Sequence, residues 1–294
     1  MTIGPAEVFD LGYRPYEGER TSRWRRRRAI WRDGIRIALG LGRGAGAKIT
    51  PWLLIALALA PVLVLIVIAS LAASVGGDSA DADLPSYAEY YEFAIVPLAL
   101  FAALVGPLLL CPDRRAGVLS LYAARPITPA DYVGARWAAF LTVSLAVVWL
   151  PEALLFGWNA LEASSLSSFI ADEWDVVPRF LAAGAVLAVV LTTLALLGAS
   201  FTARRGHAAV ATLAVLFVGS FIGGFAEDSF SGPIADAVSL VSLPQALTDG
   251  IRWIFDDELL DRPVSGSLVV LWLVALSVAL AAGLLVQTRR LMRA

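Results

Sequence analysis

Few residues of this sequence could do chemistry on their own. A single cysteine, Cys111, and a single histidine, His207, cannot build a disulfide framework or a Cys/His zinc site. Neither has a base or a second ligand near it in the sequence, and no H-E-x-x-H or Ser/His/Asp set can be assembled. We therefore expect a non-catalytic chain with no metal site and no cofactor of its own.

One glycine-rich stretch, GRGAGAKIT at residues 42–50, suggests a phosphate-binding loop at first sight. Such a loop needs G-x-x-x-x-G-K-[ST], so that backbone amides and the lysine surround the phosphates. Here Ala47 stands where the second glycine should be, and Ile49 where the magnesium-binding hydroxyl should be. Lys48 is the only lysine in the chain, so no other segment can supply the motif. Any nucleotide hydrolysis must come from a partner chain.

Glu152 is the one acidic residue well inside an apolar run. A carboxylate in hydrocarbon costs about 2.5 to 3.5 kcal/mol on insertion scales, so this side chain should face protein or water. Two interpretations follow from its place near the outer end of a span. Either the side chain reaches the lipid headgroups, or it contacts cargo or a partner.

The segments that carry these residues are those of a membrane protein. Of the 294 residues, 59% are hydrophobic and 16% are charged, which is too apolar for a soluble domain of this length. A helix needs about 20 apolar residues to cross a hydrocarbon core about 30 Å thick. Six stretches of this kind predict six transmembrane helices, at residues 52–75, 93–111, 132–158, 180–203, 208–226 and 267–286.

Basic residues alternate between the two sets of connecting segments. Most of the 23 lie in 1–51, 112–131, 202–207 and the tail, whereas the opposite set holds only Arg252 and Arg262 beside many acids. Because basic residues are retained on the cytoplasmic side, both termini are expected to be cytoplasmic. A cleaved signal peptide is the competing interpretation of a basic start. The first apolar run begins too late in the sequence for one and is longer than a signal h-region.

We therefore expect an all-α integral membrane protein. Its parts would be a cytoplasmic N-terminal segment at 1–51, a six-helix transmembrane domain at 52–286 and a cytoplasmic tail at 287–294. Arginine in place of lysine, together with spans filled by alanine, leucine and valine, suggests a bacterial protein, and hence the plasma (inner) membrane.

The N-terminal segment contains a predicted interfacial helix, with apolar residues on one face and arginines on the adjacent arc. Such a helix would lie along the cytoplasmic leaflet as an amphipathic elbow before the first span, with its arginines facing anionic lipid. A disordered basic arm is the alternative. A nucleic-acid arm fits less well, because the apolar face would have nothing to cover. That face is formed by Trp24, Trp31, Ile35 and Leu39.

The connection between the second and third spans, PDRRAGVLSLYAARPITPADY at 112–132, is too long for a tight turn. Its apolar residues recur at helical spacing between arginines and two prolines, which predicts a short amphipathic helix and then a stiff return to the membrane. This helix either floats at the interface or docks a cytoplasmic protein. In the second case the docking residues are Arg114, Arg115, Gly117, Leu119, Leu121, Tyr122, Arg125 and Pro126.

Residues 227–265 form a long connection on the opposite side, with two helix-like pieces around 234–243 and 245–255. Their apolar residues are too many for a solvated loop and too interrupted for a span. We expect a short external helical hairpin between the fifth and sixth spans that dips into the outer leaflet. Its acidic residues lack the spacing of a calcium loop and should be solvated.

With these features on one chain, the sequence resembles the permease subunit of an ATP-binding-cassette (ABC) exporter of the ABC-2 type. The resemblance rests on six spans, the elbow helix, and a loop with a charged residue, a glycine, an L-x-x-L-like patch and an R-P-[IV] turn before Y-V. An external Leu-Pro turn with a following apolar residue also fits. The matching residues are Arg115, Gly117, Leu119, Leu121, Arg125-Pro126-Ile127, Tyr132-Val133, Leu243-Pro244 and Leu247.

This resemblance implies a machine of several chains. Two copies of the subunit, or this one and a relative, would pair with two ABC ATPase subunits that bind ATP and magnesium. Closure of the ATPases would push on 112–131 and the elbow helix, the two bundles would rock to export cargo, and the external hairpin would act as a lid. An apolar transport path does not show which cargo is exported.

Two of the predicted spans contain proline or glycine residues that can affect helix bending or packing. A lever from the loop into the second span would need hinges, for which Pro97 and the pair Gly106 and Pro107 are candidates, although prolines in a span also occur without a role. In the fifth span the spacing of Gly219 and Gly223 permits close packing.

Two other classes of function stay open. An ion-gradient-driven secondary transporter usually shows inverted repeats or titratable residues at mid-membrane, and Glu152 is the residue nearest to that description. A membrane-embedded enzyme is the weaker alternative, because the sequence lacks the reagents for it.

Overall fold

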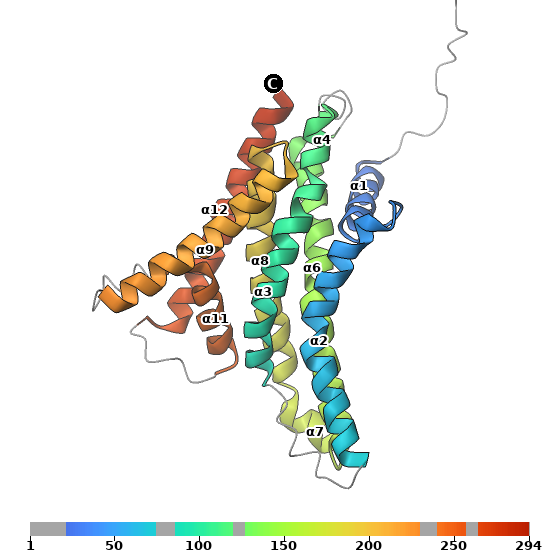
Figure 1. Cartoon of the computed structure of the whole chain (residues 1–294), viewed down its shortest axis with the longest axis vertical. Helices are drawn as coiled ribbons and strands as arrows, with labels where there is room; N and C mark the ends of the chain where they lie inside the picture. The colour runs from blue at the N-terminus through green and yellow to red at the C-terminus, as the bar shows by residue number, and fades with distance from the viewer. Residues whose placement is uncertain (1–21, 75–85, 120–126, 230–239, 257–263, 294) are drawn as a thin grey trace, which may run out of the picture.

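The computed structural model describes residues 22–74, 86–119, 127–229, 240–256 and 264–293 (Figure 1). Over these residues the fold is all-helical, and six helices are long and apolar enough to cross a membrane. This is the architecture of a multi-pass membrane protein. The six are α2 (Gly46–Ser74), α3 (Tyr87–Val105), α6 (Pro129–Glu162), α8 (Val176–Phe201), α9 (Arg205–Ser229) and α12 (Gly266–Arg293).

The predicted number of helices long and apolar enough to span a membrane is confirmed, and each overlaps one of the predicted stretches; the second stretch continues from α3 through η2 to the start of α4. Several of the helices run past the apolar stretches, as does α6, which has 34 residues. An apolar run marks the part suited to hydrocarbon, whereas backbone hydrogen bonding continues the helix into the polar ends. The shorter helices are α1 (Arg23–Ala38), η2 (Gly106–Leu109), α4 (Cys111–Arg115), α7 (Leu166–Glu173) and α11 (Leu243–Ile254).

Helices α3 and α8 form the centre of the bundle. In each, 67% of the most apolar stretch is buried, compared with 22% in α2 and 17% in α12. Helix α8 contacts α3, α6, α9, α11 and α12, and the rings of Phe101 and Phe140 stack between α3 and α6 at 5.5 Å. The outer helices present apolar side chains away from this centre, which suits contact with lipid or with another subunit.

Helix α1 is the amphipathic helix expected before the first span, but it packs on protein. Its buried residues are Ile30, Gly34 and Ala38, and it lies against α6. A Cβ atom added to Gly34 would lie 2.6 Å from Cβ of Ala139, so only glycine permits this approach. Trp24, at the start of the predicted apolar face, is 69% exposed. The helix therefore uses one apolar stripe for α6 and leaves Trp24 at the surface.

The second span changes its helical form near one end. Pro97 lies inside regular α3, whereas at Gly106 and Pro107 the chain passes into the 3-10 turn η2 and then into α4. A Cβ atom on Gly106 would lie 3.0 Å from Cβ of Ala195 on α8, so this glycine is also needed for packing. Movement about these positions stays a prediction.

The segment before α12 contains one of the two predicted helical pieces. Helix α11 matches the piece around 245–255, and its Leu247 is fully buried. Most of the piece around 234–243 lies outside the described residues.

Close packing at the two glycines of α9 is confirmed. A Cβ atom added to Gly219 would lie 2.7 Å from the Val241 carbonyl oxygen, and one added to Gly223 would lie 2.5 Å from the Ser242 Cβ. The partner of α9 at these positions is therefore the chain that leads into α11.

Candidate functional site at the arginine-rich end of the bundle

The basic segments of the sequence gather at one end of the fold. Helices α1 and α4, the turn from α8 to α9 and the last turns of α12 lie together at the upper end in Figure 1. We call this the arginine-rich end. Helix α7 and the C-terminal end of α2 lie at the opposite end (Figure 1). The described parts of the segments that carry most of the basic residues thus lie at the same end of the bundle.

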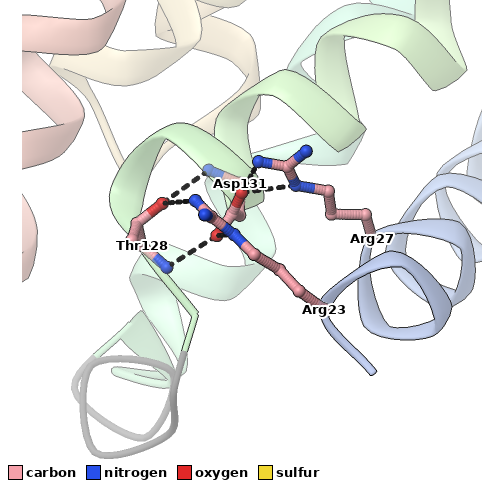
Figure 2. Close-up of polar contacts among 4 residues, drawn as sticks. All are labelled: Arg23, Arg27, Thr128 and Asp131. Atoms are coloured by element: carbon pink, nitrogen blue, oxygen red, sulfur yellow. Dashed lines mark hydrogen bonds and ion pairs between the residues drawn. The ribbon is translucent and has the colours of Figure 1, made fainter. Parts of the chain in front are cut away.

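Asp131, near the start of α6, joins this helix to α1 (Figure 2). Its carboxylate accepts a hydrogen bond from Arg23 Nε at 2.8 Å and pairs with Arg27. The Asp131 side chain is only 2% exposed, whereas the two arginines are 58% and 43% exposed. The hydrogen bond to this carboxylate raises the pKa of the Arg23 guanidinium above its ordinary value. The fold therefore holds a buried anion between two cations at the surface.

The local sequence explains why Asp131 is in place. Thr128 is the N-cap of α6, Pro129 occupies the first turn, and Asp131 stands three residues after the cap. The Thr128 hydroxyl accepts from the Asp131 amide at 3.2 Å, and the Asp131 carboxylate accepts from the Thr128 amide at 3.2 Å (Figure 2). This reciprocal capping box fixes the carboxylate before α1 docks on it.

Arg136, one turn further along α6, ties three segments together. Its Nη1 donates to Asp33 of α1 at 2.8 Å, and its Nη2 donates to Asp113 of α4 at 3.0 Å. The Tyr132 hydroxyl donates to the same Asp113 oxygen at 2.7 Å. With 3% of the Arg136 side chain exposed, the two carboxylates compensate a buried positive charge. Helices α1, α4 and α6 are thus held in one arrangement.

Sequence reasoning missed this network. The sequence pattern assigned no role to Arg136, Asp33, Asp113 or Asp131. The signal that could have found it is the arginine itself, because a charge inside an apolar stretch needs a partner of opposite sign.

The predicted docking residues other than Leu119 fall into three groups. Arg115 is exposed, and Arg114 donates to the Ser200 carbonyl oxygen of α8 at 2.6 Å. Gly117 has a φ of +66° and closes α4, with the Gly117 amide bonded to the Arg114 carbonyl and the Val118 amide to the Asp113 carbonyl. This pair of bonds is a Schellman motif, which explains the glycine. The third group, Leu121, Tyr122, Arg125 and Pro126, lies outside the described residues.

Leu119 requires a correction. The sequence suggested that it belongs to an exposed apolar patch, but its side chain is 8% exposed and packs in the core of the bundle. In the described part of this connection, the exposed residues before Leu119 are Arg115, Ala116 and Gly117.

A groove of about 660 Å³ runs between α1 and the first turns of α6. Trp24, Arg28 and Trp31 line it on the α1 side, with Asp131 and Gly134 on the α6 side. The Trp31 indole donates to the Thr142 hydroxyl at 3.3 Å. Of the remaining residues of the predicted face, Ile35 and Leu39 are half-buried against the core.

Glu152 lies further along α6, toward the opposite end of the bundle, and it is completely buried. Neither of its carboxylate oxygens has a hydrogen-bond partner among the described residues. Tyr90 and Tyr91 of α3 lie within electrostatic range, but their hydroxyls donate to the carbonyls of Ala58 at 3.1 Å and Phe180 at 2.6 Å. The interpretation in which Glu152 reaches the headgroups is therefore wrong, because its side chain is enclosed by protein.

The described residues contain no cluster of histidine, cysteine and carboxylate side chains that could hold a metal ion. No protein-family model matches the chain, and no curated protein matches it either.

Proposed function

We propose that this chain is the permease subunit of an ATP-driven exporter of the ABC-2 type, in the plasma membrane of a bacterium. Its arginine-rich end would face the cytoplasm, with both termini on that side. A second permease subunit would complete the transport path. ATP and magnesium would bind to separate ATPase subunits.

The observation that carries this proposal is the network around Arg136. An ATPase that pushes on the connection at 112–131 needs a stiff link from that connection into the membrane. Asp113 and Asp33 bind one buried guanidinium on α6, so α4 and α1 are connected to the third long helix by charge-assisted hydrogen bonds. A force on α1 or α4 would therefore be transmitted directly to α6 through these hydrogen bonds.

The partner ATPase is the main test. The chain would be purified from its native membranes with a C-terminal tag, and the complex assayed for a stoichiometric subunit that hydrolyses ATP. Arg115→Glu should weaken that association, because Arg115 is exposed in the docking segment. The matched control is Arg290→Glu, which makes the same charge change on α12. An isolated chain that transports in liposomes without ATP would contradict the proposal.

A second candidate function is favoured by one observation. Glu152 is a buried carboxylate without a hydrogen-bond partner among the described residues, and such groups on membrane helices mark proton or cation pathways. A secondary transporter would use it to couple cargo movement to an ion gradient. In liposomes with an imposed proton gradient, this candidate requires cargo flux that Glu152→Gln abolishes. Flux that depends on ATP and is unchanged by Glu152→Gln would exclude it.

A further inference from the structure

A second cavity at the arginine-rich end has a different character from the groove under α1. It has a volume of about 440 Å³ and lies where three segments meet. They contribute four arginines: Arg43 before α2, Arg115 at the end of α4, and the neighbours Arg204 and Arg205 where the turn after α8 leads into α9. Four positive charges from three segments converge on one space.

These four guanidinium groups have no counter-charge in the described part of the chain. None of them forms a side-chain hydrogen bond or ion pair with another described residue, and no carboxylate lines the cavity. The nearest acid in the sequence, Asp113, is already bound by Arg136 and Tyr132. Like charges held together repel one another, so an anion in the cavity would stabilise this arrangement.

The first turn of α9 contributes to the same field. Arg205 and Gly206 line the cavity, and a helix N-terminus carries a partial positive charge on its free backbone amides. Guanidinium groups bind phosphate oxygens in pairs of parallel hydrogen bonds, which a point charge such as lysine cannot do. The chemistry of the lining therefore selects phosphate over a simple halide.

The position of the cavity also limits its ligand. It is bounded by the ends of α4 and α8 and the start of α9, where the apolar spans give way to charge. Phe201, two residues before the lining, is 63% exposed, and Val210, on the first turns of α9, is 67% exposed. A cavity at this depth, with apolar side chains beside it, is accessible to a phospholipid headgroup from the membrane and to soluble phosphate from water.

We propose that this cavity is a binding site for a phosphate anion, supplied by the headgroup of an anionic phospholipid or by inorganic phosphate. The inference is independent of the proposed exporter function. The guanidinium groups of Arg115, Arg204 and Arg205 surround the phosphate, and Arg43 closes the site from the α2 side. An occupied site joins the α8–α9 turn to α4 through the ligand.

The test uses the full chain in detergent micelles. Retained lipid is measured by native mass spectrometry, and the midpoint of thermal unfolding is followed with added phosphatidylglycerol, phosphatidylcholine of the same acyl chains, or inorganic phosphate against chloride at equal ionic strength. Arg204→Gln/Arg205→Gln is the variant. Arg289→Gln/Arg290→Gln is the matched control, because it removes two exposed charges at the same end outside the cavity.

The protein should bind phosphatidylglycerol in preference to phosphatidylcholine. The Arg204→Gln/Arg205→Gln variant should bind phosphatidylglycerol at least about tenfold more weakly, and the control should bind it with little change. Stabilisation by phosphatidylglycerol alone assigns the site to lipid, and equal stabilisation by inorganic phosphate assigns it to the soluble anion. Arg204→Lys/Arg205→Lys should fold and bind with intermediate affinity. Equal losses of phosphatidylglycerol binding in the variant and the control would overturn the site. It would also be overturned if the Arg204/Arg205 variant lost a protein partner while its anion binding stayed unchanged.

Discussion

Helix α6 carries two buried ionisable side chains whose surroundings differ. Arg136 has carboxylates on α1 and α4 within hydrogen-bonding distance and a tyrosine ring 5.8 Å from its guanidinium carbon. Glu152 has the same degree of burial and no hydrogen-bond partner in the described part of the chain. A compensated charge is a structural element, whereas an uncompensated one lowers stability and needs another explanation.

The difference separates a side chain that is needed for stability from one that is needed for function. Removing a partner from the Arg136 network should damage the fold, because a buried ion would be left alone. Neutralising Glu152 should leave the fold intact or improve it, so any loss would appear in function. Four substitutions test this contrast.

Arg136→Met should have the largest effect, a loss of about 3 kcal/mol in the free energy of unfolding, because Asp113 would be left partly buried without its cation. The measurement is the denaturant midpoint in mixed micelles. Arg32→Gln, an exposed arginine on α1, is the control and should change the midpoint little. The double variant Asp113→Asn/Arg136→Met should recover part of the loss, and a purely additive double variant would show that the pair is not coupled.

Gly34→Ala should cost about 2 kcal/mol, because its Cβ would overlap the Ala139 Cβ and push α1 away from α6. This substitution separates packing from charge, since it leaves every ionised group in place. The same denaturation assay measures it, and Gly34→Ala/Ala139→Gly should restore the midpoint. Failure of the second substitution to rescue the first would mean that α1 is not held by this contact.

Asp131→Asn should destabilise the protein by about 1 kcal/mol, because the capping hydrogen bonds can be kept while the ion pairs to two half-exposed arginines are lost. The effect should be local and visible as faster proteolysis within α1. Asp172→Asn on α7 is the control, an exposed carboxylate at the other end of the bundle. Equal proteolysis of α1 in both variants would contradict the assigned role of Asp131.

Glu152→Gln should have the smallest effect on stability and the opposite sign, a gain of up to about 1 kcal/mol, because it removes an ionisable group that costs free energy to bury and keeps the volume. Thermal unfolding in micelles measures it, with Glu162→Gln at the end of α6 as the exposed control. A clear loss of stability would show that Glu152 has a partner after all, and the contrast with Arg136 would be lost.

The spans were predictable because their signal is local. An apolar stretch of sufficient length excludes other solutions in a bilayer, and α2, α3, α6, α8, α9 and α12 all followed from it. The helical part of α1 was predictable in the same way, from the spacing of its apolar residues.

The site was less predictable because its contacts join distant segments. Asp33 and Asp113 bind Arg136 from 103 and 23 residues away, and nothing in either local sequence announces the pairing. The burial of Leu119 and Glu152 depends likewise on which helices surround them. Sequence periodicity indicates that a face is apolar, but it does not show whether lipid, a partner or the chain itself covers that face.

The docking of α1 on α6 has a consequence for biosynthesis. Arg23 and its acceptor Asp131 are 108 residues apart, and two spans lie between them. When α1 leaves the ribosome its binding surface does not yet exist, so it can reach its final position only after the third span has been inserted. Until then Arg23 and Arg27 are without the carboxylate that they bind in the finished fold. Assembly of this bundle therefore includes a step in which α1, although made before α2, α3 and α6, is placed only after all three.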